Sequence, residues 1–248
     1  TTTHTHRETN RAPASPKQRK DRIMAGEKTT GLVLLDFWVS PFAQRCRIAL
    51  AEKGLACESL EQELLGAKSD LLLGSNPVHK KVPVLLHDGR AVCESLVILE
   101  YIEDAFPGAA PLLLPTDPHA RAQARFWADY VDKRVYSCGT RLWKLKGEER
   151  AAARADMLET LRTLDAELGD KAFFGGEAFG FVDVTLIPLT SWFYSYEKHG
   201  GFSVEEECPR LAEWARRCGE RETVAKVLTP PEEVHDFIGL LKKHYGLE

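Results

Sequence analysis

The feature that most constrains the fold is an apolar run that leads directly into a proline-initiated helix. Residues 32–38, which end in Phe37 and Trp38, predict a short buried strand. Pro41 suits the first position of a helix, where its missing N–H costs nothing, so Ser40 falls at the N-cap. The sequence therefore predicts a strand-to-helix junction with the Ser40 hydroxyl at the positive end of a helix dipole. As a plain cap, such a serine contributes about 1 kcal/mol.

The same junction excludes one kind of chemistry. Thioredoxin-type redox proteins carry a C-x-x-C pair at this place, whereas here the two positions are Ser40 and Ala43. Thiol–disulfide exchange by this site is therefore excluded. A hydroxyl at this position can only serve a thiol that arrives from elsewhere.

The amino-acid composition is ordinary for a globular protein and excludes further classes of protein. The 248 residues are 44% hydrophobic and 28% charged. No apolar stretch reaches the roughly 18 residues of a membrane-spanning helix, so we expect no integral membrane protein. The six cysteines are scattered, with neither a C-x-x-C pair nor the spacing of metal ligands. We therefore expect no metal site and a reducing, cytoplasmic location.

The first 30 residues differ from the rest of the chain. Residues 1–23 carry six basic and two acidic side chains, a net charge of +4, which leaves −8 on the remainder because the whole chain carries −4. With almost no apolar residues this segment cannot offset its ordering entropy, and Met24 is a natural start. We expect residues 1–30 to be a disordered or non-native extension; a transit peptide or a nuclear-import patch is a weaker interpretation. The acidic remainder argues against nucleic acid as a partner.

Residues 31–107 alternate between strand and helix patterns. The expected elements after the first strand are a helix at 41–53, strands at 56–61, 82–86 and 91–93, and a helix at 94–106. Two strands joined by a helix run parallel, and two joined by the turn at 87–90 run antiparallel. The order therefore predicts a small mixed sheet.

The remainder of the chain reads as helical. Four prolines between residues 107 and 118 mark a linker, which we place at 108–117. Beyond it the apolar spacing predicts helices at 121–146, 148–168, 183–198, 209–219 and 231–244. Residues 118–248 are expected to form an all-helical domain.

Several motifs, taken in their order, carry a resemblance to a known family. They are Trp38-Val39-Ser40-Pro41-Phe42, Ser75-Asn76-Pro77-Val78-His79-Lys80-Lys81-Val82-Pro83-Val84-Leu85, Cys93-Glu94-Ser95, the run from Arg125 to Asp132, and Phe174-Gly175-Gly176. From about residue 32 onward the chain resembles the soluble glutathione transferases, most closely the plant tau class. The resemblance implies an α+β fold: a thioredoxin-like domain at 31–107, with a mixed four-stranded sheet and helices, followed by the all-helical domain. It also implies a homodimer and glutathione as co-substrate, with no other cofactor.

Both the residue chemistry and the resemblance point to a glutathione site. Glu94 offers a carboxylate to the γ-glutamyl ammonium, while Ser95 and the N–H groups at the start of its helix offer an anion site for the γ-glutamyl carboxylate. The resemblance adds Lys68 and Lys81 as partners of the glycine carboxylate. The alternatives are an ordinary acidic helix start and solvated lysines.

Val82 and Pro83 begin a strand where proline cannot extend the ladder through its own nitrogen. In similar proteins this bond is cis, and the Val82 backbone pairs with the cysteinyl residue of glutathione like an added strand. A trans proline at a strand edge is the alternative, and the sequence does not separate the two.

Ser40 is interpreted as the catalytic residue, acting as a hydrogen-bond donor to the bound thiolate and not as a nucleophile. A free thiol with a pKa of about 8.5 is mostly protonated at neutral pH, and the thiolate is the nucleophile. Lowering this pKa by about two units takes roughly 2.7 kcal/mol. One charge-assisted hydrogen bond of about 1.5–3 kcal/mol supplies most of that.

The resemblance also places an electrophile site between the two halves. Its expected aromatic walls are Trp38, Phe42, Tyr136, Trp143, Trp192 and Phe237. Such walls suit hydrophobic electrophiles of varied shape, although aromatic residues at helical spacing are more often core. Asp183, in Phe181-Val182-Asp183, is expected to have a structural role in which it satisfies backbone donors at a helix start.

The predicted function is conjugation of the glutathione thiolate to hydrophobic electrophiles, of the xenobiotic and herbicide detoxification type. Reduction of organic hydroperoxides is expected as a side activity. The alternative is a ligandin-like carrier that binds and transports apolar metabolites without turnover. Ser40 favours the enzyme, because a carrier needs no donor aimed at a thiol. Glutaredoxin-like or dehydroascorbate reduction would need a cysteine at position 40.

Overall fold

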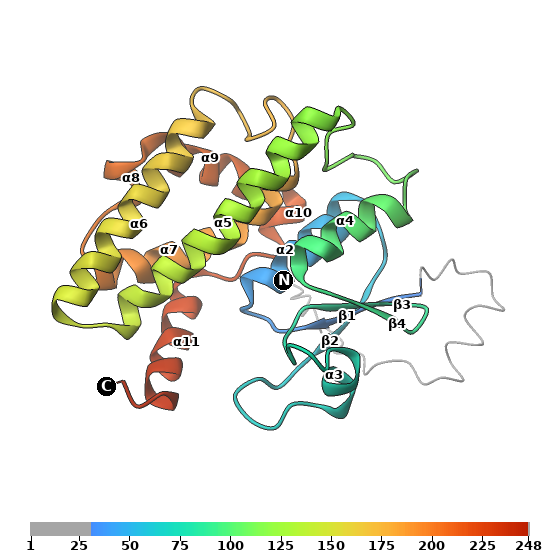
Figure 1. Cartoon of the computed structure of the whole chain (residues 1–248), viewed down its shortest axis with the longest axis horizontal. Helices are drawn as coiled ribbons and strands as arrows, with labels where there is room; N and C mark the ends of the chain where they lie inside the picture. Colours follow the sequence, from blue (N-terminus) through green and yellow to red (C-terminus); the bar gives the residue numbers. More distant parts are fainter. Residues whose placement is uncertain (1–30, 248) are drawn as a thin grey trace, which may run out of the picture. The chain divides into compact units, whose positions relative to one another are not determined.

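The computed structural model describes residues 31–247, and the extension expected at residues 1–30 lies outside the described residues. Four strands form a sheet in the order β2-β1-β3-β4, with β1 (Leu32–Asp36) beside β2 (Glu58–Glu61) and β3 (Val84–His87) beside β4 (Arg90–Cys93) (Figure 1). β1 and β2 run parallel, whereas β3 is antiparallel to both β1 and β4. The mixed sheet that the sequence predicts is confirmed.

Local signals place the elements around this sheet. Asp88 and Gly89 join β3 to β4 with φ values of 51° and 79°, the positive values that a type I′ hairpin turn requires. α2 (Pro41–Glu52) follows β1 and has proline in its first turn, as expected. α4 (Ser95–Ala105) follows β4.

One helix of this half was not expected. α3 (Asp70–Ser75) has six residues, too few for an apolar period to be visible in the sequence. Its N-cap is Ser69, whose hydroxyl accepts a hydrogen bond from the Leu72 N–H at 3.1 Å. The pair Ser69-Asp70, a capping serine before an acidic first turn, is the signal that predicts this helix.

From residue 118 onward the described chain is helical, as predicted. The helices are α5 (Pro118–Lys144), α6 (Gly147–Leu168), α7 (Phe181–Gly200), α8 (Val204–Glu207), α9 (Pro209–Gly219), α10 (Glu222–Ala225) and α11 (Pro231–His244). The four-residue helices α8 and α10 were missed because a single turn shows no periodicity. Among the helices of residues 31–247, none is long and apolar enough to cross a membrane.

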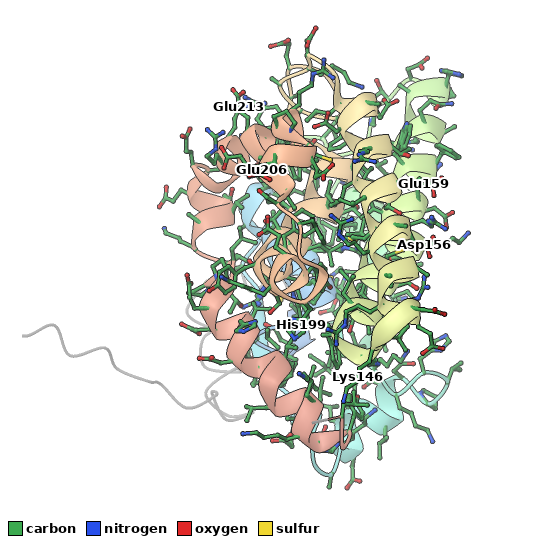
Figure 2. All side chains as sticks on the ribbon, turned by 90° about the vertical axis from the view of Figure 1, so that its left-hand side faces the viewer. Lys146, Asp156, Glu159, His199, Glu206 and Glu213 are labelled. Atoms are coloured by element: carbon green, nitrogen blue, oxygen red, sulfur yellow. The ribbon has the colours of Figure 1, made fainter. Side chains whose placement is uncertain are left out.

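α7 forms the centre of the helical part. Most of its 20 residues are buried, because α5, α9 and α11 pack against it and α2 contacts it from the sheet half. The helices outside it carry the charges. Figure 2 labels two acidic residues of α6: Glu159, which is exposed, and Asp156, whose carboxylate forms an ion pair with Arg141 of α5 at 2.5 Å.

A buried ion pair holds the connection between the two halves. Lys53 Nζ lies 3.0 Å from Glu103 Oε1, and both side chains are almost fully buried. The Lys53 ammonium also donates to the carbonyls of Ala109 and Pro111, while Glu103 accepts from the Leu113 N–H. The linker therefore has fixed partners on α2 and α4, and its boundaries at 108–117 stay a prediction.

Candidate active site

Ser40 sits where β1 leads into α2, as the sequence predicts. Its backbone N–H donates to the Phe37 carbonyl at 2.9 Å, which closes a turn, and its Oγ accepts from the Ala43 N–H at 3.3 Å. The first turn of α2 contains no acidic residue that would offset the helix dipole. Because Oγ already accepts from the backbone, the hydroxyl proton remains free to be donated to a ligand.

The sheet register gathers the other predicted glutathione residues at the same edge. Leu35 pairs with Val84, and Val84 pairs with Cys93. The end of β1, the start of β3 and the end of β4 therefore lie side by side. Val82-Pro83 and Glu94-Ser95 stand immediately next to the ends of β3 and β4 in the chain, and Ser40 follows the end of β1 by four residues.

The Val82–Pro83 peptide bond is cis, the form that the resemblance implied and that the residues alone did not separate from trans. Asn76, a buried residue of the motif Ser75–Leu85 to which the sequence analysis gave no role in the site, anchors the loop before the cis bond: its side-chain amide donates to the Lys81 carbonyl at 3.0 Å. Lys68 Nζ donates to the Lys80 carbonyl at 2.7 Å, which ties the chain after β2 to the same loop. The Lys81 side chain is exposed. The two predicted lysines are thus connected to one loop, next to the cis bond.

Glu94 has an unusual backbone. Its φ of 70° is positive, a conformation that costs a non-glycine residue about 1–3 kcal/mol. Its carboxylate is exposed and makes no cap to α4, and the Nε2 atom of the His79 ring lies 4.0 Å from Glu94 Oε1. The Glu94 carboxylate is therefore exposed, lies beside the sheet edge on a strained backbone, and is available to a ligand cation.

Ser95, by contrast, is buried and is bound by a residue that sequence reasoning missed. Arg45 of α2 donates to Ser95 Oγ at 3.1 Å, to Asp132 Oδ1 of α5 at 2.5 Å and to the Thr185 carbonyl of α7 at 2.8 Å. Burial lowers the pKa of Arg45, whereas Asp132 opposes that shift, and an arginine in a protein stays protonated. The sequence signal that could have indicated this role was the position of Arg45 among mostly apolar buried residues of α2.

Cysteine is a poor candidate for the thiol chemistry. Burial raises the pKa of Cys46, Cys57 and Cys93, the three cysteines of the sheet half, and brings that of Cys57 to about 12. A thiol with a raised pKa supplies little thiolate at neutral pH.

The predicted electrophile residues fall into two sets of ring contacts. The Phe42 and Tyr136 rings are 5.0 Å apart, and Tyr136 lies 5.9 Å from Trp192. Separately, the Trp38 ring lies 5.7 Å from Phe237 of α11. Burial raises the pKa of Tyr136 and keeps its phenol neutral.

The six aromatic residues differ in exposure. Trp38 is 37% exposed, but Trp143 and Trp192 are only 3% and 2% exposed and belong to the core. Trp143 packs under the Lys144 ammonium and makes none of the ring contacts above. Phe237 is also buried, at 7% exposed, so the walls open to a ligand are offered chiefly by Trp38, Phe42 and Tyr136.

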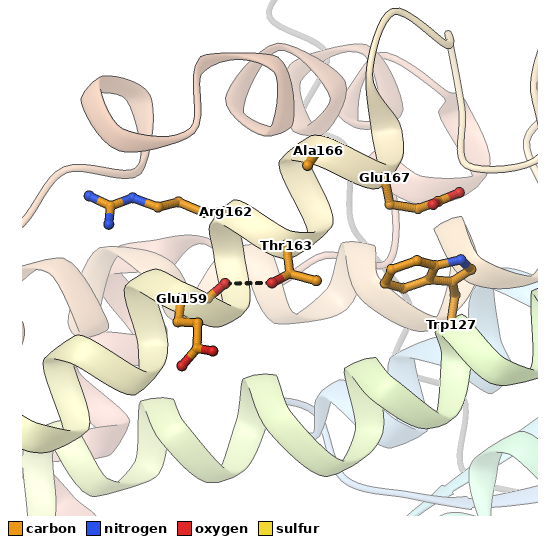
Figure 3. Close-up of a pocket in the computed structure, with 6 residues that line it drawn as sticks. All are labelled: Trp127, Glu159, Arg162, Thr163, Ala166 and Glu167. Carbon is orange, nitrogen blue, oxygen red and sulfur yellow. Dashed lines mark hydrogen bonds between the residues drawn. The ribbon is translucent and has the colours of Figure 1, made fainter.

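Two surface pockets lie away from this edge. One, of about 650 Å³, lies between α5 and α6; its lining residues are Trp127, Glu159, Arg162, Thr163, Ala166 and Glu167 (Figure 3). The second, of about 560 Å³, is at the end of α7 and is lined by Tyr194, Glu197, Lys198, Gly201, Phe202, Ser203 and Glu206. Neither contains a residue of the predicted site.

Comparison with known proteins agrees with this geometry. The glutathione S-transferase N-terminal domain model matches residues 34–110, and the C-terminal domain model matches residues 147–217. Probable glutathione S-transferase GSTU1 of Oryza sativa subsp. indica is 65% identical over 91% of this chain and 100% of its own length. Probable glutathione S-transferase parC of Nicotiana tabacum is 53% identical over 91% of this chain and 100% of its own length.

Solved structures give the same result. Rice GST1 in complex with glutathione superposes with a TM-score of 0.85 at 64% identity, covering 88% of this chain and 99% of that one. The tau-class glutathione S-transferase of mango gives a TM-score of 0.80 at 39% identity, over 86% and 99% of the two chains. The chain belongs to the glutathione S-transferase family. Within that family it is a tau-class enzyme, and its activity is the conjugation of glutathione.

Proposed function

We propose that Ser40 is the catalytic residue and that its hydroxyl donates a hydrogen bond to the thiolate of bound glutathione. The observation that carries this proposal is the N-cap geometry: Oγ accepts from Ala43, so the proton is left for the sulfur. A donor at the positive end of a helix favours the charged form of the thiol over the neutral form. No general base next to Ser40 is needed, because the serine itself is never deprotonated.

The sheet edge beside Ser40 holds the rest of glutathione in this proposal. The Val82 backbone next to cis Pro83 pairs with the cysteinyl residue, Glu94 takes the γ-glutamyl ammonium, and Ser95 takes the γ-glutamyl carboxylate. Lys68 and Lys81 take the glycine carboxylate. The rice relative was solved in complex with glutathione, which supports the same ligand here.

The second substrate is a hydrophobic electrophile of the xenobiotic or herbicide type. It is held chiefly by the aromatic rings of Trp38, Phe42 and Tyr136, and Trp143, Trp192 and Phe237 are the buried members of the same set. Reduction of organic hydroperoxides is a side activity of the same thiolate. The enzyme needs no cofactor besides glutathione, acts as a homodimer and is cytoplasmic.

Conjugation of chlorodinitrobenzene by wild type and Ser40→Ala, with glutathione binding measured in parallel, tests the proposal. Ser137→Ala, at an exposed position of α5, is the matched control. Loss of one charge-assisted hydrogen bond is expected to lower turnover roughly 10- to 100-fold while glutathione still binds. Unchanged turnover in Ser40→Ala would rule out the proposed role. No turnover in wild type, together with tight binding of apolar ligands, would favour the carrier.

A further inference from the structure

The carbonyl group of Trp38, two residues before Ser40, is held by side chains from both ends of the chain. Arg47 donates to it at 2.9 Å, the Thr229 hydroxyl at 3.1 Å and the Gln44 amide at 3.4 Å. Arg47 and Gln44 come from α2, which Ser40 itself caps. Thr229 comes from the segment before α11, 191 residues along the chain from Trp38.

Thr229 and Gln44 form a buried polar pair. Their side chains are 6% and 0% exposed, and the Gln44 amide donates to Thr229 Oγ1 at 2.8 Å. The Thr229 hydroxyl therefore accepts a hydrogen bond from Gln44 and donates one to the Trp38 carbonyl. Gln44 Oε1 is buried and has no hydrogen-bond partner among residues 31–247. The orientation of the Gln44 amide is therefore set by the hydrogen bonds that its N–H groups donate to Thr229 and to the Trp38 carbonyl. The bond between Gln44 and Thr229 is buried, where a hydrogen bond is electrostatically stronger than in water, so it holds the Thr229 hydroxyl in place.

The same turn also contacts α11 through its aromatic rings. The Phe37 and Trp38 rings lie 5.6 Å and 5.7 Å from the Phe237 ring. The Trp38 N–H donates to Glu61 Oε1 at 2.9 Å. The turn that ends at Ser40 is therefore contacted by residues outside it, and the segment 229–237 supplies two of these contacts, one from the Thr229 hydroxyl and one from the Phe237 ring.

We propose that Thr229 is a positioning residue for Ser40. Its hydroxyl fixes the peptide plane that follows Trp38 and thereby the direction in which the Ser40 hydroxyl meets the glutathione sulfur. The inference rests on the proposed role of Ser40. Small displacements of a catalytic group lower the rate strongly, because the hydrogen bond to the developing charge depends on geometry.

The test compares Thr229→Val, which removes the hydroxyl at constant shape, with Thr229→Ser, which restores it. The readouts are the pKa of the glutathione thiol on the enzyme, from thiolate absorbance, the dissociation constant of glutathione, and kcat. Thr229→Val is expected to raise the thiol pKa by about half to one unit and to lower kcat about three- to tenfold at neutral pH. Binding of glutathione should change less than about twofold. Thr229→Ser should return both values toward wild type.

Two further variants keep the test decisive. Thr160→Val removes another buried threonine hydroxyl, one that donates to the Asp156 carbonyl within α6, and should leave the thiol pKa unchanged. Gln44→Met removes the amide but keeps Thr229 on the Trp38 carbonyl, so it should shift the pKa in the same direction by less. It also provides the test if Thr229→Val fails to fold.

The outcomes separate the two proposals. If Ser40→Ala raises the thiol pKa but the Thr229 and Gln44 variants do not, the positioning role is overturned and the role of Ser40 stands. If Ser40→Ala leaves the thiol pKa unchanged, the proposed function itself is wrong. Loss of stability in Thr229→Val with an unchanged pKa and kcat would make Thr229 merely structural.

Discussion

The indole N–H of Trp214, on α9, donates to Asp183 Oδ1 at 2.8 Å and joins α9 to the first turn of α7. The same oxygen accepts from the Phe174 N–H at 3.0 Å, and Oδ2 accepts from the Gly180 N–H at 2.9 Å. Asp183 is fully buried. The sequence predicted that it would satisfy backbone donors, which is confirmed; the contact to Trp214 was not predicted.

Asp183→Ala should destabilise the protein without acting on the chemistry. It leaves three buried donors without an acceptor, which we expect to cost about 3–5 kcal/mol. The free energy of unfolding from urea denaturation measures this. Turnover per folded molecule should stay near the wild-type value. Asp170→Ala, at a fully exposed carboxylate, should change stability by less than about 0.5 kcal/mol. A cost below about 1 kcal/mol for Asp183→Ala would contradict the structural role.

Glu94→Gly should weaken glutathione binding and raise the free energy of unfolding. Glycine adopts the φ of 70° without strain, so we expect a gain of about 1 kcal/mol in the free energy of unfolding. Loss of the proposed partner of the γ-glutamyl ammonium should weaken glutathione binding by about tenfold or more.

The matched variant Glu94→Gln separates the two effects. It removes the charge but keeps the strained backbone, so it should weaken binding with no gain in stability. Calorimetric titration with glutathione and thermal unfolding measure the two quantities. If both variants bind as wild type does, Glu94 is an ordinary helix start.

Two glycines within helices should respond to alanine with opposite signs. A Cβ on Gly139 of α5 would lie 2.2 Å from the Tyr196 ring, whereas a Cβ on Gly239 of α11 would meet nothing within 4 Å. Gly139→Ala should therefore cost about 1–3 kcal/mol through overpacking. Gly239→Ala should gain about 0.5–1 kcal/mol from helix propensity. Chemical denaturation measures both, and a shared sign would contradict the packing described for α5 and α7.

Acidification should weaken the contact between α7 and α11 through His199. This side chain, labelled in Figure 2, donates to the Ser195 carbonyl at 2.8 Å and lies 5.7 Å from the His235 ring of α11. Burial lowers the pKa of His199, and Lys242, His235 and Arg150 lower it further, while the Ser195 carbonyl opposes them.

A lowered histidine pKa fixes the direction of the effect. The stabilising contribution is complete above the unfolded pKa of about 6.5 and is lost as the pH falls below it toward the lower folded value. Urea denaturation between about pH 5 and 8 should show wild type losing stability on the acid side. His199→Gln should have a shallower slope there. An equal slope in the two proteins would exclude His199 as its source.

Some of the site was readable from the sequence because its signals are local. Ser40 and Pro41 define a cap and a first helical turn within a few residues, and Asp88-Gly89 defines a hairpin. The proline-started helices α9 and α11 were predicted residue for residue. The combination and order of the motifs Trp38–Phe42, Ser75–Leu85 and Cys93–Ser95 indicated the glutathione transferases. Their joint place at one end of the sheet became visible only in the structure.

The distant residues that hold these motifs in place became known from the packing of the helices. Arg45 meets Asp132 of α5, Thr229 meets Trp38, and Trp214 meets Asp183; each pair joins residues that no local pattern connects. The degree to which Trp143 and Trp192 are buried also depends on how α5 and α7 pack. From the sequence alone we predicted the strands and the longer helices and the chemical class of the site, because caps, turns and strand patterns act over a few residues, whereas the short helices α3, α8 and α10 were missed. The tertiary structure alone decided the partners of each buried polar group, because burial makes unpaired donors and acceptors costly only once the helices have packed.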